Sequence, residues 1–251
     1  MGREFEVRKE IELDATPEEV WDAIATGPGI DSWFMGRSEI EPRVGGAGRL
    51  TVGGHVDEST VTAWEPSRKL AYRTDEAEDG SFMALEWLVE GRDKGSTVLR
   101  LVQSGFLSGD WETEYEAMKA GWDLYLHTLA QYLTHFQGHT AEVVSAMRLQ
   151  AADQEHAWAV IKKELGLGEA VAEGDRVSFT PDGLTRVEGV VDYVDLPTFV
   201  GVRTRDGLYR FIHSGASRGD AVVLGHHVFS GGTGREPAEA DWQAWLARVF
   251  P

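Results

Sequence analysis

The chain has 251 residues, a length that suits two ordinary domains or one large one. Hydrophobic residues make up 42% and charged residues 26%, which is typical of a globular protein and argues against a disordered one. With 42 acidic and 24 basic side chains the net charge is −18, so we expect no binding to nucleic acid or to an anionic membrane.

Cysteine is absent, which excludes disulfides, thiolate nucleophiles and Cys-type zinc sites and fits a cytoplasmic protein. No apolar run approaches the ~20 residues that cross a bilayer. We expect no cofactor, because the glycine-rich VGGAGRL leads into a strand rather than a phosphate-binding helix. We also expect no metal, because His226 and His227 are neighbours on a predicted strand and point to opposite faces.

The chain opens with alternating apolar and charged residues over 5–13, a pattern that predicts a half-buried strand. A helix follows, because Thr16 suits an N-cap, Pro17 a first turn and Glu19 the third position of a capping box. A second short helix is predicted over 30–34. Further strands are predicted over 38–42, 48–52, 59–64, 69–74, 82–90 and 96–103, and a long helix over 111–136.

Alternate positions on the last two of these strands are apolar and should face the long helix, since that helix is the only element large enough to cover the sheet. The first half of the chain is therefore predicted as an α+β unit, a curved antiparallel sheet with a long C-terminal helix. Met118, Trp122 and Tyr125 share one stripe of that helix with Leu129.

The second half repeats this pattern in shortened form. We match Leu13, Ala15 and Glu19 with Leu149, Ala151 and Glu155, and Trp21 with Trp158 after a one-residue insertion; Leu70, Tyr72, Arg73 and Thr74 match Val200, Val202, Arg203 and Thr204. Strands are predicted over 176–180, 186–194, 198–213 with an internal turn, and 221–229, and a closing helix over 237–250. We predict two domains, 1–138 and 139–251, the second a degenerate copy of the first.

Four segments together carry a family resemblance: LDATPEEVWDAIAT, VTAWEPSRKLAYR, STVLRLVQSGF and GWDLYLHTLAQYL. They resemble the SRPBCC or START-like superfamily, in the group related to the heat-shock chaperone ATPase activator. The second half is similar only at the level of the fold. The resemblance implies a helix-grip fold with a cavity between helix and sheet. Members bind lipids, polyketides and other apolar molecules, and some resemble self-resistance proteins of enediyne antibiotic clusters.

Apolar and aromatic side chains of the first half form the predicted ligand-binding set, with Gln103 and Tyr125 as its polar members. The set consists of Trp33, Phe34, Met83, Leu85, Trp87, Leu99, Leu101, Gln103, Met118, Trp122, Tyr125 and Leu129. The same spacing is also that of an ordinary packed core, and periodicity does not separate the two interpretations.

The sequence indicates no catalytic residue. The GASRG segment matches G-x-S-x-G, but a strand follows it, so Ser217 is interpreted as a turn residue rather than a nucleophile. The leading hypothesis is a binding protein that sequesters an apolar, polyketide-type small molecule, in a setting of natural-product biosynthesis and enediyne self-resistance. A co-chaperone-like interaction module and a polyketide cyclase or dehydratase are the alternatives. A monomer and a homodimer both remain open.

Overall fold

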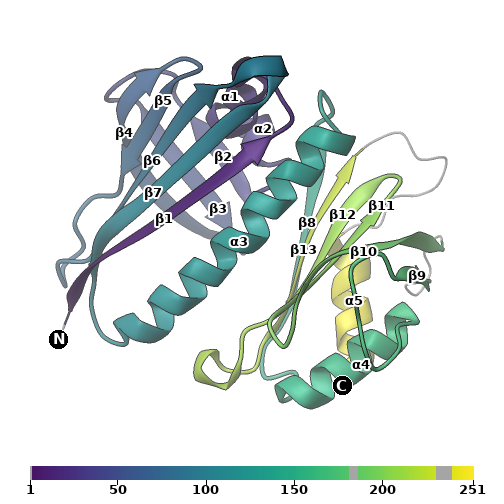
Figure 1. Ribbon diagram of the computed structural model, residues 1–251. Helices are drawn as coiled ribbons and strands as arrows, with labels where there is room; N and C mark the ends of the chain where they lie inside the picture. The colour runs from purple at the N-terminus through teal and green to yellow at the C-terminus, as the bar shows by residue number, and fades with distance from the viewer. Residues whose placement is uncertain (1, 181–185, 230–238) are drawn as a thin grey trace. The chain divides into compact units, whose positions relative to one another are not determined.

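The chain divides after Thr140 into an N-terminal domain, Met1–Thr140, and a C-terminal domain, Ala141–Pro251. A computed structural model describes residues 2–180, 186–229 and 239–251 (Figure 1). Each domain is an antiparallel sheet with helices, and the whole chain is an α+β protein of helix-grip type, as the sequence predicts.

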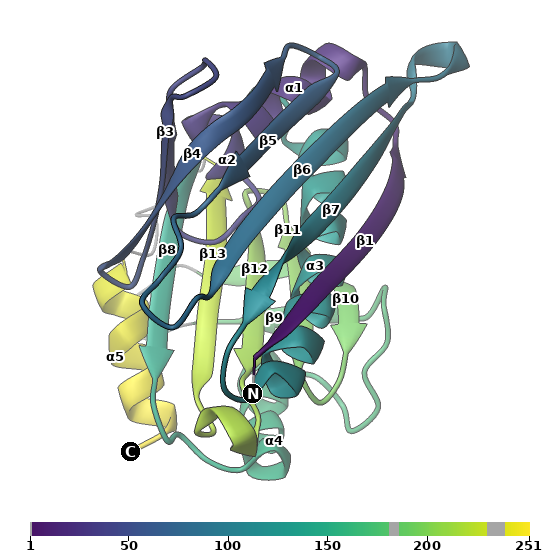
Figure 2. The same cartoon turned by 90° about the vertical axis from the view of Figure 1, so that its left-hand side faces the viewer.

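The N-terminal sheet has seven strands in the order β1-β7-β6-β5-β4-β3-β2. They are β1 (Arg3–Leu13), β2 (Arg37–Ile40), β3 (Ala47–Val52), β4 (His55–Glu65), β5 (Lys69–Arg73), β6 (Phe82–Gly91) and β7 (Thr97–Leu107). Figure 2 shows β4, β5, β6, β7 and β1 side by side with α3 (Trp111–His135) behind them. A short 3-10 turn, Asp93–Gly95, joins β6 to β7.

Helix α1 (Pro17–Ala25) begins at the predicted capping box: the Glu19 amide donates to Thr16 Oγ1 at 3.3 Å, and the Thr16 amide donates to Glu19 Oε2 at 2.7 Å. The second short helix was misplaced in the prediction. Helix α2 is Gly27–Ile30, because the Thr26 hydroxyl accepts from the Gly29 amide at 3.1 Å and starts a new helix where the glycines suggested only an end.

Helix α3 lies against one face of the sheet, which we call the inner face. Its side chains Trp122, Leu129 and Leu133 are buried there. An ion pair fixes the helix to the edge strand, with Lys9 Nζ of β1 at 2.5 Å from Asp123 Oδ1. Near its first turn, the Arg3 guanidinium lies 4.6 Å from the centre of the Trp111 ring.

The C-terminal sheet has six strands in the order β8-β13-β12-β11-β10-β9. The strands are β8 (Ala141–Arg148), β9 (Arg176–Phe179), β10 (Val187–Asp195), β11 (Phe199–Thr204), β12 (Gly207–His213) and β13 (Val222–Phe229). Helix α4 (Gln154–Leu165) ends at Gly166, whose φ of 71° is left-handed and suits glycine. Helix α5 (Glu239–Val249) lies within the predicted 237–250, and positions 237–238 are outside the described residues.

The two sheets repeat one topology, down to a shared irregularity. A register shift falls between Val61 and Ala63 where β4 pairs with β5, and another falls between Val191 and Tyr193 where β10 pairs with β11. Aligned on these bulges, Tyr72 corresponds to Val202, as the sequence comparison predicted.

The helical part of that comparison needs one correction. Thr16 and Asp153 are the N-caps of α1 and α4, and Trp21 and Trp158 follow them at the same distance without an insertion. Glu19 therefore corresponds to His156 and not to Glu155. The predicted match with Leu149 also fails, because its side chain is 68% exposed whereas Leu13 is buried.

Candidate functional site

The inner face of the N-terminal sheet has a closed half and an open half. On β6, β7 and β1, inward side chains such as Trp87, Leu99 and Leu13 are buried. On the other half of the same face, Val61 of β4 and Leu70 of β5 are buried as well. Four further inward side chains of β2, β3 and β5 are only half-buried; they are Ile40, Leu50, Val52 and Tyr72. The apolar surface of this half is thus accessible to solvent.

An aromatic cluster lies along the boundary between the two halves. Phe34 stacks on Trp122 with ring centres 5.5 Å apart and contacts Tyr125 at 4.7 Å. Trp87 packs edge-on against Trp122 at 5.6 Å and against Trp33 at 6.0 Å. The Trp33 indole donates to the Ala23 carbonyl at 2.9 Å, which fixes the loop after α2 beside the cluster. Rings in such edge and offset geometries attract one another beyond simple burial.

Gln103 of β7 is the polar group at the centre of this cluster. Trp122 Nε1 donates to Gln103 Oε1 at 2.5 Å, and Gln103 Nε2 lies 3.5 Å from Met83 Sδ. The indole hydrogen bond orients the carboxamide, so its oxygen is directed at the helix and its nitrogen away from it.

Tyr72 of β5 lies in the same row of the sheet as Gln103. Cross-strand pairing aligns Val61, Tyr72, Leu85, Gln103 and Val7, which we call the central row. Burial raises the pKa of Tyr72 to about 12, and a hydrogen bond from the Trp87 side chain acts in the opposite direction. The phenol therefore stays protonated at neutral pH.

The predicted site residues fall into three groups in the structure. Leu85, Trp87, Leu99, Leu101, Trp33, Gln103, Trp122 and Leu129 are buried in the closed half. Phe34, Met118 and Tyr125 are half-buried. Met83 is 40% exposed at the start of β6.

Sequence analysis missed the residues of the open half. Tyr72 appeared there only in the comparison of the two repeats, and Ile40, Leu50 and Val52 were assigned to strands but not to the site. The period-two pattern of these strands shows which side chains share a face. It does not show which face the helix covers, because that depends on cross-strand register. Register is a property of the folded sheet rather than of any one strand.

Other predicted features have plain structural roles. Ser217 lies on an exposed 3-10 turn, Ala216–Arg218, that leads into β13, so its position is that of a turn residue. Across residues 2–180, 186–229 and 239–251, no group of three or more His, Asp or Glu side chains is placed to hold a metal ion. None of the described helices is long and apolar enough to span a membrane.

The C-terminal domain fills its interior with large rings. Its central row is Val191, Val202, Tyr209, His226 and Val144. Trp242 of α5 lies edge-on to His226 with ring centres 4.4 Å apart, and it also contacts Tyr209 at 5.9 Å. Trp242, Trp245 and Phe211 are at most 1% exposed, so this interior is a packed core.

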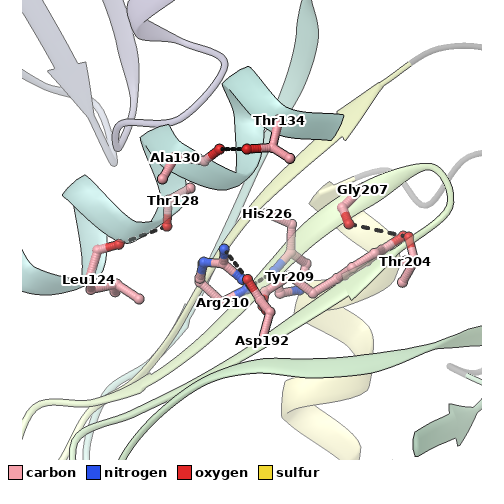
Figure 3. A network of polar contacts seen from close by, with 10 residues as sticks. All are labelled: Leu124, Thr128, Ala130, Thr134, Asp192, Thr204, Gly207, Tyr209, Arg210 and His226. Carbon is pink, nitrogen blue, oxygen red and sulfur yellow. Dashed lines mark hydrogen bonds and ion pairs between the residues drawn. The ribbon is translucent and has the colours of Figure 1, made fainter. Parts of the chain in front are cut away.

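The opposite face of the C-terminal sheet carries a buried ion pair. Arg210 Nη1 and Nη2 donate to Asp192 Oδ1 and Oδ2 at 3.0 and 2.9 Å, a bidentate arrangement (Figure 3). The two side chains are 2% and 4% exposed. A Cβ on Gly201 would lie 2.7 Å from Arg210 Nη1 and 3.0 Å from Asp192 Oδ1, so glycine makes room for the pair.

Comparison with known proteins finds a family similarity in the N-terminal part. The model described as "Activator of Hsp90 ATPase homolog 1-like protein" matches residues 14–134. No curated protein matches the chain. Among solved structures, protein MLL2253 from Mesorhizobium loti is 26% identical, with a TM-score of 0.48, over 53% of this chain and 98% of that one.

Two solved structures are similar over nearly the whole chain. DynU16, a protein of the dynemicin biosynthetic locus, is 18% identical with a TM-score of 0.45 over 98% of this chain and 97% of its own. BexL, a di-domain ARO/CYC of the BE-7585A biosynthetic pathway, is 12% identical with a TM-score of 0.48 over 98% and 93%.

Proposed function

Because the N-terminal domain matches the family model of Activator of Hsp90 ATPase homolog 1-like proteins and resembles the START-like superfamily, we propose that it binds an apolar aromatic small molecule. The ligand lies between α3 and the open half of the sheet. Its walls are the predicted site residues together with Ile40, Leu50, Val52 and Tyr72. The function is sequestration of the ligand in a helix-grip interior.

The half-buried state of inward apolar side chains carries this proposal. Ile40, Leu50 and Val52 alternate with exposed residues and face inward, yet they are incompletely covered. Apolar surface left accessible beside an aromatic cluster gains free energy when a ligand covers it, at about 25 cal/mol per Å². A site with apolar walls and few polar groups is the usual form of a small-molecule site.

Fluorescence with a model ligand tests the proposal. Emodin, a neutral tricyclic polyketide, should quench tryptophan emission, because Trp87 and Trp122 lie beside the proposed site. Leu50→Glu should weaken emodin binding at least tenfold, since it buries a carboxylate under an apolar ligand. Thr51→Glu is the matched control on the exposed outer face of the same strand and should bind normally. Equal binding by both variants, or no quenching of the parent protein, contradicts the proposal.

Natural-product self-resistance is the finer form of the proposal, supported by the sequence resemblance. An anthraquinone-fused enediyne such as dynemicin then becomes the expected ligand. A stoichiometric amount of protein should protect plasmid DNA from cleavage by the activated enediyne, and Leu50→Glu should lose this protection. Protection that is equally strong with Leu50→Glu would place the effect elsewhere on the protein.

A protein-interaction role is the second candidate, and the description of the matching family model favours it. It predicts that the purified chain raises the ATPase rate of Hsp90 from the same cell. An unchanged rate over a range of chain concentrations contradicts this candidate and leaves the ligand-binding proposal untouched.

A further inference from the structure

The two polar side chains of the N-terminal central row occupy equivalent settings. Tyr72 and Gln103 both pair with Leu85, one from each side, so they point inward two strands apart. Strand spacing puts their backbones about 10 Å from each other. Both lie beside the aromatic cluster, Tyr72 in the open half and Gln103 at its boundary.

A tryptophan lies beside each of these groups. Trp122 Nε1 donates to Gln103 Oε1 at 2.5 Å. Trp87 acts on Tyr72 by lowering the pKa of the phenol, against the larger effect of burial. An indole has only an N–H to give, so Gln103 accepts from Trp122, and the influence of Trp87 is directed at the phenolic oxygen. Each of the two residues can still donate a hydrogen bond. Tyr72 can donate its phenolic proton, and Gln103 can donate its amide hydrogens. A hydroxyl that accepts one hydrogen bond also becomes a better donor for the next.

We propose that this interior selects ligands bearing a neutral acceptor oxygen, such as a ketone or quinone carbonyl, and that Tyr72 donates the hydrogen bond to it. The inference rests on the proposed function and specifies its ligand class. Tyr72 is the better placed donor, because the residue is half-buried in the open half, whereas Gln103 is 9% exposed and its Nε2 already lies 3.5 Å from Met83 Sδ.

Charge restricts the acceptor to a neutral one. A carboxylate or phosphate could also accept from a phenol, but burial of an anion without a cation is costly. Lys9 is the inward cation of β1, and its ammonium is already paired with Asp123 at 2.5 Å. The net charge of −18 adds a long-range repulsion against anions.

The C-terminal domain shows that the fold itself does not require a phenol at this position. Val202 replaces Tyr72 in the equivalent place of the central row and is fully buried. The row thus accepts an apolar side chain without loss of topology. Tyr72 is therefore a candidate for ligand recognition rather than for folding.

Two ligands of the same shape test the proposal. Fluorenone carries one carbonyl, and fluorene is the corresponding hydrocarbon, so equilibrium dialysis of both reports the hydrogen bond alone. The full-length protein should bind fluorenone about tenfold tighter than fluorene, the ratio expected for one net hydrogen bond. Tyr72→Phe should remove this preference and leave fluorene binding unchanged, which also shows that the variant is folded.

Tyr115→Phe is the matched control, because the Tyr115 hydroxyl donates to the Glu6 carbonyl at 3.5 Å and is already used. It should keep the tenfold preference. Equal affinity of the parent protein for fluorenone and fluorene overturns the inference and leaves the proposed function intact, as does a preference that survives Tyr72→Phe. If neither compound nor emodin binds, the proposed function fails together with the inference.

Discussion

The N-terminal and C-terminal domains share a strand order, a β-bulge and a central row, yet their interiors differ. In the N-terminal domain the row contributes Tyr72 and Gln103, and the helix contributes Trp122, whose indole N–H bonds the glutamine. In the C-terminal domain the corresponding row residues are Val202 and His226, and Trp242 packs on the histidine. Similar backbones thus support a partly accessible interior in one copy and a closed aromatic core in the other.

Hydrogen bonding shows the same contrast. His226 Nδ1 accepts from the Arg210 amide at 3.1 Å, so the ring proton is on Nε2. In the described part of the chain, neither that Nε2 nor Trp242 Nε1 has a hydrogen-bond partner, although both are buried. The C-terminal interior is held by ring packing, whereas the N-terminal interior keeps oriented polar groups. Oriented polar groups beside accessible apolar surface are what a ligand site requires.

Among these predictions, truncation of Trp242 should cause the largest loss of unfolding free energy. Trp242→Ala should destabilise the C-terminal domain by about 3–5 kcal/mol, because it leaves a cavity in a filled core. Phe34→Ala should cost the N-terminal domain clearly less, since Phe34 is only half-buried. Denaturant titration followed by hydrogen exchange on peptides from each domain measures both. Similar losses in the two domains would mean that their interiors are equally packed.

Acid should destabilise the C-terminal domain through His226. Burial lowers the pKa of this histidine to about 3, with His227 and Arg210 acting in the same direction. The unfolded chain binds the proton near pH 6.5 and the folded one does not, so stability is full above pH 6.5 and falls as the pH drops toward 3. The slope is about 1.4 kcal/mol per pH unit for one proton.

The difference between the parent protein and His226→Gln isolates this slope, because all other titrating groups are common to both. Denaturant midpoints of the C-terminal domain at pH 7, 6, 5 and 4 provide the measurement. Parallel pH profiles for the two proteins would show that His226 does not titrate differently on folding.

Two glycines beside the Asp192–Arg210 ion pair allow a matched test of how tightly that face of the C-terminal sheet is packed. Ala71 of the N-terminal sheet corresponds to Gly201, which lies beside the Asp192–Arg210 pair. Gly201→Ala should cost about 1–3 kcal/mol by overpacking against the pair. Gly225 flanks Arg210 on the other side, and an added Cβ there meets nothing within 4 Å. Gly225→Ala should stay within about 0.5 kcal/mol of the parent in the same denaturation assay.

The last prediction concerns the Trp122–Gln103 hydrogen bond, whose pairwise coupling is a small energy. Gln103→Leu should cost the N-terminal domain about 1–3 kcal/mol, because it leaves a buried indole N–H unpaired. A double-mutant cycle with Trp122→Phe should return a coupling of about 1 kcal/mol. The corresponding cycle of His226→Leu with Trp242→Phe should show no hydrogen-bond coupling. Equal coupling in both domains would remove the distinction between them.

Much of the fold was predictable from local pattern. The capping box at Thr16 and Glu19, the long helix from Trp111 and most strands follow from side-chain chemistry within a few residues. The errors occurred where local signals compete: Thr26 starts a helix in a segment whose glycines indicate an end. The exposed Leu149 and the shifted Glu155 show that a weak repeat is aligned better by caps and bulges than by matching letters.

The candidate site was only partly predictable. Aromatic residues such as Trp87 and Trp122 were assigned to the interior from their spacing. The identity of the open-half residues Ile40, Leu50, Val52 and Tyr72 came only from the structure. Spacing reports which side chains share a face, but how completely that face is covered depends on where the helix lies.

The amino-acid sequence by itself determined the elements, their order, the repeat and the acidic character of this protein, because each depends on neighbouring residues or on composition. Tertiary structure alone decided which apolar faces are closed, as Trp242 closes one interior, and which stay accessible, as at Leu50 and Tyr72. Burial results from contacts between residues far apart in the chain, and cross-strand register sets those contacts.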